Sequence, residues 1–383
     1  MSKRIYINGF SSISAYGFGH QQVEDKHSKA EALFSDFKFQ DEIIKVSRLS
    51  SSAEAAVQKL ISEQPKYARL DRSVLMAILC TRACIENQKF DKTSTGLNIG
   101  SSRGATELFE TYHQEYIQQG KVSALSSPTT TLGNLATWPA QDIGLKGVQI
   151  SHSITCSTAL HGFLNAKAWL QSNMSEAFIV GGSESPLTHF TIAQMKAIKL
   201  YSNLNDELPC RSLDLEKQQN SLILAEAAGT ALLTKQAENA LAEVVGFGYA
   251  TEMITHNISI STDALCFQEA MKMALKEAQL DTVDAVVMHA PGTKKGDQAE
   301  INAVNAVFKT APLLTTNKWQ IGHSFGASGM LSIQTALYML NHGFYKNPFY
   351  DQQITKNQPI KSVLVNAVGF GGNAVSLILK AIN

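Results

Sequence analysis

The sequence lacks an excess of charge of either sign, because 33 Lys and Arg residues balance 33 Asp and Glu residues and the isoelectric point is about 7.1. A basic surface that binds nucleic acid or anionic membranes is therefore not expected. No apolar run is long enough to cross a membrane. The first ten residues also lack the apolar core and small-residue cleavage site of a secretory signal.

Cysteine is scarce, with five residues, an odd number without paired spacing. Such usage indicates a reducing compartment, so we expect a cytoplasmic protein. Cys80 and Cys84 lie four residues apart and could flank a metal ion, but no second pair accompanies them. Buried helix cysteines are the simpler interpretation, and no metal site is expected. The 383 residues, 44% of them hydrophobic, suggest two or three domains or one large duplicated unit.

An internal repeat is the most informative feature that is present. Four pieces occur in the same order in both halves of the chain. They are an apolar strand running into Gly-Phe, a strand with a Gly-rich turn and a helix, a strand followed by a reactive residue and a long helix, and a strand entering glycines. The matched pairs are residues 5–10 with 243–247, 97–107 with 285–300, 154–157 with 321–324, and 177–182 with 363–372.

Strands that alternate with helices indicate mainly parallel sheets with helices on their faces. We therefore expect an α/β fold of two similar halves, residues 1–238 and 239–383, packed together. Ligands of such sheets bind beyond the carboxyl ends of the strands. The candidate residues of both halves follow strand-like runs, so they can converge on one site without being close in the sequence.

Cys156 lies between a strand-like run and a helix expected over residues 157–171. At such a turn the positive end of the helix dipole favours the thiolate, and a sharp turn exposes the sulfur, as in a nucleophile elbow. Most free cysteines are instead buried and inert. From these residues alone both interpretations stay open.

Two histidines follow strand-like runs in the second half. His289 comes after residues 284–288, and His323 comes after residues 319–322 and before a helix expected from Ser324. A histidine near a helix N-terminus is expected to be neutral, and its N–H can donate to developing negative charge. A structural role is the alternative for each histidine alone, but their equivalent places opposite a cysteine favour catalysis.

A lysine and a glycine turn complete the candidate set. Lys318 is expected at the base of the strand before His323, where it can pair with Glu300 or simply lie on the surface. Residues 369–372, Gly-Phe-Gly-Gly, have unblocked N–H groups and freedom of φ, which suit an oxyanion hole. An ordinary tight turn is the alternative.

Together these motifs resemble the elongating β-ketoacyl-acyl-carrier-protein synthases of the thiolase fold, along essentially the whole chain. The resemblance implies two αβ halves packed as a layered αβαβα core. The motifs that match are the active-site cysteine segment (155–159), the His-Gly-Thr-Gly-Thr…Gly-Asp motif (289–297), the Lys-Ser-Asn-Ile-Gly-His motif (318–323) and the C-terminal glycine turn (369–372).

The chain also departs from that family. Pro291 replaces the first of two threonines that hold the phosphopantetheine arm in the family, and only Thr293 remains. Residues 373–374 are Asn-Ala instead of Thr-Asn, and residues 225–227 lose a Gly-x-Gly pattern. Arg103 occupies a turn position that lines the acyl tunnel in many fatty-acid synthases of this type. These departures favour a specialised secondary-metabolite or polyene pathway.

By resemblance, Cys156 accepts an acyl group from a carrier-protein thioester. The main-chain N–H groups of Cys156 and Phe370, in the turn that contains Gly371, form the oxyanion hole, and Phe370 also gates the tunnel. His289 and His323 stabilise the enolate as malonyl-carrier protein loses carbon dioxide. The resemblance thus implies a β-ketoacyl synthase that performs decarboxylative Claisen condensation.

The remaining roles are implied in the same way. Lys318, paired with Glu300, orders the site, and Arg103 faces the far end of the acyl tunnel near a subunit interface. Because a buried charge needs a partner, Arg103 is then expected to pair with a carboxylate across the interface, to reach solvent or to point away from the tunnel. The alternative is a structural residue that braces the turn before Gly104. No permanently bound cofactor is implied, because acyl carrier protein delivers the phosphopantetheine arm. The implied partners are that carrier protein and, in a homodimer or heterodimer, a ketosynthase-like subunit.

Three other functions share some of these features. A chain-length-factor-like partner subunit has the fold without catalysis, but that family typically lacks the cysteine that Cys156 supplies. A thiolase needs a second catalytic cysteine in the C-terminal half, where Cys266 lies in a helix-like stretch outside any glycine turn. A Cys-His hydrolase leaves the second histidine and the repeat unexplained.

Overall fold

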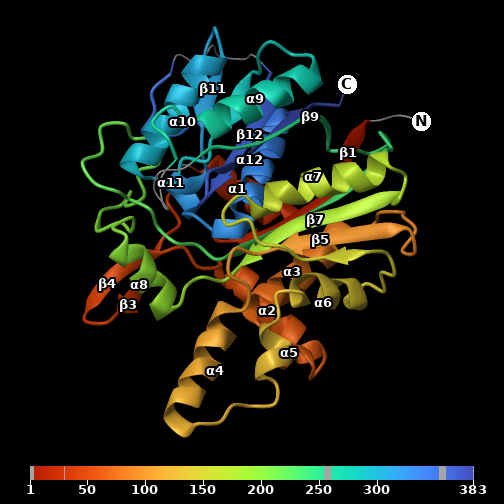
Figure 1. The fold of residues 1–383 in the computed structure, drawn as a ribbon, viewed down its shortest axis with the longest axis vertical. Coiled ribbons are helices and arrows are strands. Elements are labelled where there is room, and N and C mark those ends of the chain that lie inside the picture. Colours follow the sequence, from red (N-terminus) through yellow and green to blue (C-terminus); the bar gives the residue numbers. More distant parts are fainter. Residues whose placement is uncertain (1–3, 30, 254–259, 353–358, 383) are drawn as a thin grey trace.

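The computed structural model describes residues 4–29, 31–253, 260–352 and 359–382. Within them, a large mixed sheet of eleven strands runs through the molecule, with helices on its faces and a separate two-stranded sheet to one side (Figure 1). The strands are β1 (Ile5–Ser14), β2 (Gly17–Phe18), β3 (Ser35–Phe39), β4 (Glu42–Val46), β5 (Thr95–Gly100), β6 (Gln149–Ile150), β7 (Ala177–Glu184), β8 (Ala227–Thr234), β9 (Ala242–Thr251), β10 (Ala285–Val287), β11 (Leu313–Thr315), β12 (Ser362–Gly369) and β13 (Asn373–Lys380).

The helices connect these strands. They are α1 (His20–Ser28), α2 (Ser51–Glu63), α3 (Arg72–Cys84), α4 (Thr106–Gln119), α5 (Ser126–Thr130), α6 (Asn134–Asp142), α7 (Thr158–Gln171), α8 (His189–Ala197), α9 (Leu265–Ala278), α10 (Lys294–Val307), α11 (Lys318–Ile321) and α12 (Ser328–His342), with short 3₁₀ turns at Tyr67–Arg69 and Phe325–Ala327. None of the helices in the described part of the chain is long and apolar enough to cross a bilayer.

The strand order confirms the duplication. From the middle of the sheet outward, one half runs β1-β8-β7-β5-β6 and the other runs β9-β13-β12-β10-β11. In both halves, the strand that comes first in the sequence, β1 or β9, lies beside the strand that comes last, β8 or β13. The halves join where β1 pairs antiparallel with β9, Ile5 opposite Val244. The division between residues 238 and 239 falls in the connection from β8 to β9 and stays a prediction.

The expectation of mainly parallel sheets is wrong. The outer three strands of each half are parallel, as β6-β5-β7 and β11-β10-β12. The pairs at the middle of the sheet, including β7 with β8, β12 with β13 and β1 with β9, are antiparallel. The last strand of each half, which the sequence patterns did not reveal, returns beside its predecessor and reverses the direction.

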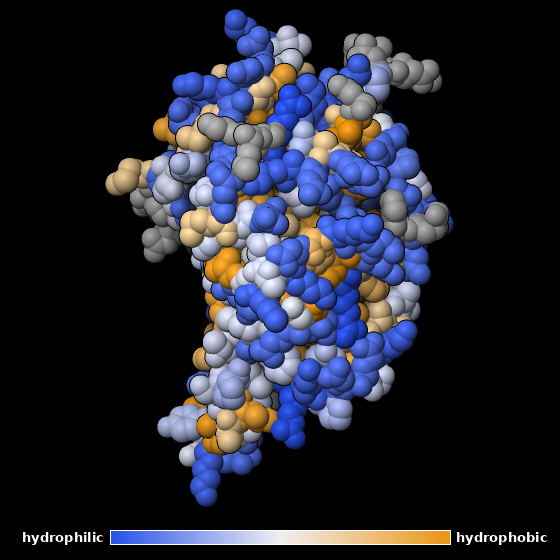
Figure 2. All heavy atoms as spheres, turned by 90° about the vertical axis from the view of Figure 1, so that its right-hand side faces the viewer, coloured by the Kyte–Doolittle hydropathy of each residue, from blue (hydrophilic) through white to orange (hydrophobic). Residues whose placement is uncertain are grey.

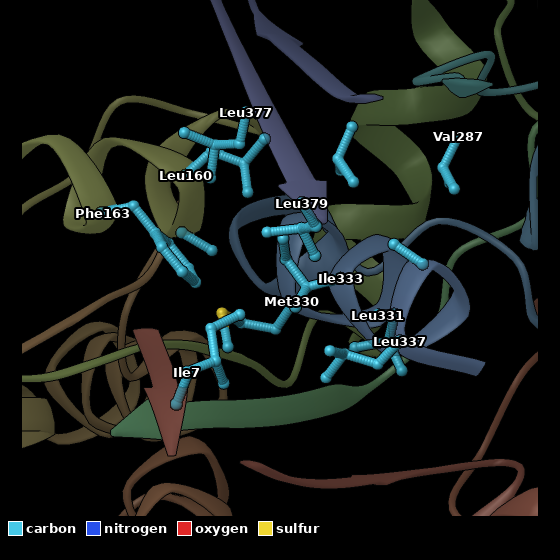
Figure 3. Close-up of a cluster of buried hydrophobic side chains, with 14 of the residues drawn as sticks. Ile7, Leu160, Phe163, Val287, Met330, Leu331, Ile333, Leu337, Leu377 and Leu379 are labelled. Carbon is cyan, nitrogen blue, oxygen red and sulfur yellow. The ribbon is translucent and has the colours of Figure 1, made fainter. Parts of the chain in front are cut away.

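The layers follow the expected αβαβα arrangement. Helices α7 and α12 lie between the two half-sheets, where Leu160, Met330 and Leu377 belong to one buried cluster (Figure 3). Helices α3 and α6 cover the outer face of the first half, and α9 and α10 cover that of the second. Burying one such apolar side chain contributes about 1.5–3 kcal/mol. Strands covered on both faces are apolar throughout, as in β7, in which every residue is buried.

Candidate active site

Cys156 lies in the loop of residues 151–157, between the end of β6 and the start of α7. The strand ends at Ile150, so the cysteine does not follow it directly as expected, and α7 begins at Thr158. Thr155 has a φ of 45°, a left-handed conformation that is unusual for a β-branched residue. Such strain occurs where the surrounding structure over-determines the backbone, often at functional sites.

The thiol of Cys156 is only 7% exposed. Burial raises its pKa to about 12, the Glu184 carboxylate acts in the same direction, and Lys318 and Arg103 oppose the rise. Desolvation of the anion therefore opposes the thiolate that a helix N-terminus was expected to favour.

His289 follows β10 and is fixed by a carboxylate on α10. The main-chain N–H groups of His289 and Ala290 donate to the two oxygens of Glu300, at 2.9 and 2.8 Å. Asn366 on β12 donates to the same carboxylate at 3.0 Å. Glu300 thus holds the loop that carries His289. Asn366 was not predicted, because nothing near it in the sequence marks it.

His323 is held by the segment before β8. The main-chain N–H of His323 donates to the carbonyl of Ile223 at 2.7 Å, and the main-chain carbonyl of His323 accepts from the N–H of Ala225 at 3.1 Å. Gly322 has a φ of 69°, and a Cβ there would lie 2.7 Å from the Ile223 oxygen. The expected helix from Ser324 begins instead as the 3₁₀ turn at Phe325, and α12 starts at Ser328.

The two imidazole rings meet in the site. Their centroids are 5.2 Å apart, and the rings are perpendicular. Burial lowers the pKa of both histidines well below the ordinary value, and the nearby Lys318 charge lowers them further. Burial therefore favours the neutral form of both rings. A neutral imidazole can donate one hydrogen bond to an oxyanion.

Lys318 is buried beside these rings but does not form the expected ion pair. It is the first residue of α11, a short helix where a strand was expected. Among the described residues its Nζ has no hydrogen-bond partner. Glu300 is already occupied by three N–H donors, and it acts on the lysine only through its charge. Burial lowers the pKa of Lys318 and raises that of Glu300.

The glycine turn links β12 and β13 as a tight hairpin that touches the nucleophile loop. Gly371 and Gly372 have φ values of 96° and 70°, which favour glycine. A Cβ at Gly369 would lie 1.7 Å from the Thr155 hydroxyl oxygen, so no other residue fits there. Phe370, 36% exposed, lines the same cavity as Cys156. The first and last predicted motifs are therefore adjacent.

A cavity of about 770 Å³ brings these groups together. Cys156, His289 and His323 lie along it with Phe370 and Thr293, and Glu300 also lines it. Thr293 caps α10, with its hydroxyl oxygen accepting from the Gly296 N–H at 3.2 Å. Among the described residues, the Thr293 hydroxyl only accepts, so its hydrogen can be donated to a ligand. Lys294, Lys295 and Pro291 line the cavity beside it.

Arg103 lies behind the cavity wall and is exposed in the single chain. Its guanidinium lies 5.2 Å from the ring centroid of Phe325 and donates to the Gln194 side chain at 2.5 Å. Phe325 lines the cavity, has a φ of 43° and packs edge-on against His323. Arg103 therefore contacts the lining of the cavity through Phe325, a residue that the sequence patterns did not single out.

Glu184, at the end of β7, is a further buried group of the site. Its carboxylate accepts from the N–H groups of Ser102, Arg103 and Gly326 and from the Ser101 hydroxyl. It thus ties the turn after β5 to the turn after His323. Burial raises the pKa of Glu184 to about 7.

A model of the beta-ketoacyl synthase N-terminal domain matches residues 15–239, and one of the C-terminal domain matches residues 241–348. The chain belongs to the beta-ketoacyl synthase family. A 3-oxoacyl-[acyl-carrier-protein] synthase 2 of Vibrio cholerae is 29% identical over 74% of this chain and 75% of its own length. The protein of the same name from Staphylococcus aureus strain COL is 25% identical over 99% and 98%.

Solved structures give the same fold. The ishigamide ketosynthase/chain length factor superposes with a TM-score of 0.86 at 18% identity, over 99% of both chains. AntDE:AntF, a type II PKS acyl-carrier protein in complex with its ketosynthase bound to the hexaketide, gives 0.85 at 17% identity, over 100% of both chains. This beta-ketoacyl synthase family member therefore has the thiolase fold that the sequence predicted.

Proposed function

We propose that this chain is a β-ketoacyl synthase that joins an acyl group to a malonyl unit by decarboxylative Claisen condensation. The observation that carries the proposal is the convergence of one thiol and two neutral histidines, Cys156, His289 and His323, on a single cavity. Fatty-acid-like, polyketide or polyene assembly is the setting that this chemistry serves. The departures at Pro291 and Arg103 favour a specialised pathway.

In the first half-reaction, the sulfur of Cys156 attacks the carbonyl carbon of an acyl thioester. The carbon–sulfur bond to the pantetheine arm breaks, and the proton of the Cys156 thiol ends on the departing sulfur. The N–H groups of Cys156 and Phe370 stabilise the tetrahedral oxyanion, an effect of about 3–4 kcal/mol for one well-placed donor. The product is an acyl-enzyme, which divides one difficult step into two.

In the second half-reaction, a malonyl thioester loses carbon dioxide, and its enolate oxygen accepts hydrogen bonds from His289 and His323. The enolate carbon attacks the acyl-Cys156 carbonyl, a carbon–carbon bond forms, and the cysteine sulfur leaves as a thiolate that takes one proton from solvent. Neutral donors suit this step because they stabilise the enolate without protonating it. The buried Lys318 contributes positive potential beside both rings.

The acyl and malonyl groups arrive on the phosphopantetheine arm of an acyl carrier protein, and no permanently bound cofactor is required. Thr293 has a hydroxyl hydrogen available for an amide of the arm, and Pro291 has none. Lys294 and Lys295, at the start of α10, supply positive charge for the phosphate of the arm. Five free cysteines support a reducing compartment such as the cytoplasm.

A second ketosynthase-like chain, the same or related, is the proposed partner of α4. This helix stands out from the body of the molecule and buries none of its own residues (Figure 1). Hydrophobic atoms gather at this end of the molecule (Figure 2), where Phe109 and Ile117 are 64% and 65% exposed. Exposed apolar surface of this kind marks an interface. The fold is similar to that of the ishigamide ketosynthase/chain length factor, and the partner is therefore either a second copy of this chain or a related chain.

The test of this function is the intact mass of the protein after incubation with acyl-acyl carrier protein, and then the products after malonyl-acyl carrier protein is added. A catalytic subunit gains one acyl mass on Cys156 and releases carbon dioxide and a β-ketoacyl thioester. A chain-length-factor-like subunit, the alternative function, gains no mass. A protein that stays unmodified beside its native partner subunits overturns the proposal.

Arg103 is proposed to limit the length of the acyl group. Arg103→Ala removes the guanidinium that backs Phe325, so the ring can move and extend the cavity. We expect acyl groups one or two carbons longer to load about ten-fold faster, since one methylene in an apolar pocket changes selectivity by about 10–200-fold. The readout is the acyl-enzyme mass distribution from a mixture of chain lengths.

A matched control is Arg48→Ala, because Arg48 also lies over a phenylalanine ring, that of Phe37 at 5.3 Å, outside the lining of the cavity. It should leave the distribution unchanged. If Arg103→Ala also leaves it unchanged while the oligomer persists, the length-limiting role is wrong. Loss of the oligomer alone would assign Arg103 to the interface.

A further inference from the structure

The loop that carries the nucleophile needs a support that the catalytic groups do not provide. Residues 151–157 form no helix and no continuous strand. Within this loop, Thr155 nevertheless has a φ of 45°. Gly369 lies so close to Thr155 that a Cβ at this glycine would overlap the threonine hydroxyl. A strained backbone persists only where its neighbours fix it.

A chain of side-chain hydrogen bonds reaches this loop from the sheet. Asn98, fully buried on β5, donates from Nδ2 to the carbonyl of Ile150 at 3.1 Å and contacts Nδ1 of His152 at 2.8 Å. Its Oδ1 accepts from Asn165 on α7 at 2.9 Å. These partners fix the orientation of the Asn98 amide, because a carbonyl accepts and an NH₂ group donates.

The amide in turn fixes the tautomer of His152. Because Nδ2 of Asn98 is a donor, Nδ1 of His152 is the acceptor and the ring hydrogen is on Nε2. Nε2 then donates to the carbonyl of Thr158 at 3.0 Å. Burial lowers the pKa of His152, which keeps the ring neutral. The carbonyl of His152 accepts from the Ser101 N–H at 3.3 Å.

Thr158 passes this restraint to the nucleophile. Its hydroxyl donates to the carbonyl of Thr155 at 2.6 Å and accepts from the N–H of Ile154 at 2.8 Å. Gly100 allows the close approach that this requires, since a Cβ there would lie 2.5 Å from the carbonyl oxygen of His152. His152 is not among the residues that line the cavity, so it acts through Thr158.

We propose that His152 is a positioning residue for acyl transfer, which holds the strained Thr155–Cys156 segment through the Asn98–His152–Thr158 chain. This inference rests on the proposed function. It concerns the direction of the Cys156 sulfur and N–H toward the thioester carbonyl, and not the acidity of the thiol.

Three variants separate the two hydrogen bonds of the ring. His152→Gln keeps an N–H group near the Nε2 position, His152→Asn keeps a polar group only near Nδ1, and His152→Leu keeps neither. We expect the Asn and Leu variants to lower the single-turnover rate of acylation by about 10-fold or more, since small displacements of a reacting group cost up to about 100-fold. His152→Gln should retain most of the rate.

The second readout is alkylation of Cys156 by iodoacetamide, which needs no oxyanion hole. Positioning predicts that alkylation changes much less than acylation, and that His152→Gln restores acylation. A merely structural role predicts faster alkylation and a lower melting temperature in all three variants. His342→Leu, at the exposed end of α12, is the control and should behave as the parent protein.

The outcomes distinguish the two levels of the proposal. If the parent protein itself gains no acyl mass, the proposed function fails and the role of His152 in acyl transfer fails with it. If the parent protein is acylated and the Asn and Leu variants match its rate, only the positioning role is overturned. Equal losses in the Gln, Asn and Leu variants, with the fold intact, also overturn it.

Discussion

Cys156→Ala is expected to abolish condensation while the protein stays folded. Without the sulfur no acyl-enzyme can form, and the loss should be at least about 10³-fold, as for the removal of other covalent nucleophiles. The substitution removes one buried atom, so the free energy of unfolding should fall by no more than about 1–2 kcal/mol. Product formation and intact mass after incubation with acyl-carrier protein are the measurements.

Cys80→Ala is the matched control, because Cys80 is also buried but lies in α3, in a different hydrophobic cluster. Both variants lose the same atom from an apolar environment, and burial raises the pKa of both thiols. Only Cys156→Ala should lose the added acyl mass. Near-normal product formation by Cys156→Ala would show that the covalent mechanism is wrong.

The sequence predicted the fold well because the internal repeat can be recognised from the sequence alone, without knowledge of which residues are in contact. The pairs matched around residues 5–10 and 243–247 became β1 and β9, and those around 177–182 and 363–372 became β7 and β12. The last strand of each half was missed because a run such as Ala227–Thr234, made of small or apolar residues, has no alternating pattern of polar and apolar side chains. These missed strands are why the sheet is mixed.

The site was predicted in outline and not in its supports. Motifs singled out Cys156 and both histidines, and the structure brings all three to one cavity, although only His289 comes shortly after a strand. The expected place of Lys318 on a strand was wrong because four residues of helix and of strand look alike in a short apolar run. Glu184 and His152 act through partners on other elements, and no local pattern records such contacts.

Burial also bears on the expectation that Cys156 favours the thiolate. A helix terminus contributes about 0.3–1 kcal/mol at an exposed site. Removing a thiolate from water costs more than that, and the pKa of Cys156 rises to about 12. The extent of burial is a property of the assembled halves and cannot be read from the residues around position 156.

His289→Ala and His323→Ala are expected to suppress decarboxylation much more than acylation. Acyl transfer moves one proton from the Cys156 thiol to the departing pantetheine sulfur, so it needs no net acid or base despite the raised pKa. Decarboxylation instead creates an anion inside a buried cavity, where removing one donor costs about 10²–10³-fold. Carbon dioxide release should therefore fall by that factor, while acyl-Cys156 stays detectable by mass.

The loops that carry His289 and His323 should keep their conformations in these variants. The rates of acylation and decarboxylation can therefore be compared directly. Main-chain groups and not the imidazoles hold both positions, His289 through Glu300 and His323 through Ile223 and Ala225. A glutamine at either position supplies a neutral N–H and should recover part of the carbon dioxide release. Equal loss of acylation and decarboxylation in folded alanine variants would instead assign the histidines to removal of the thiol proton, the role that the raised pKa of Cys156 makes the natural competitor.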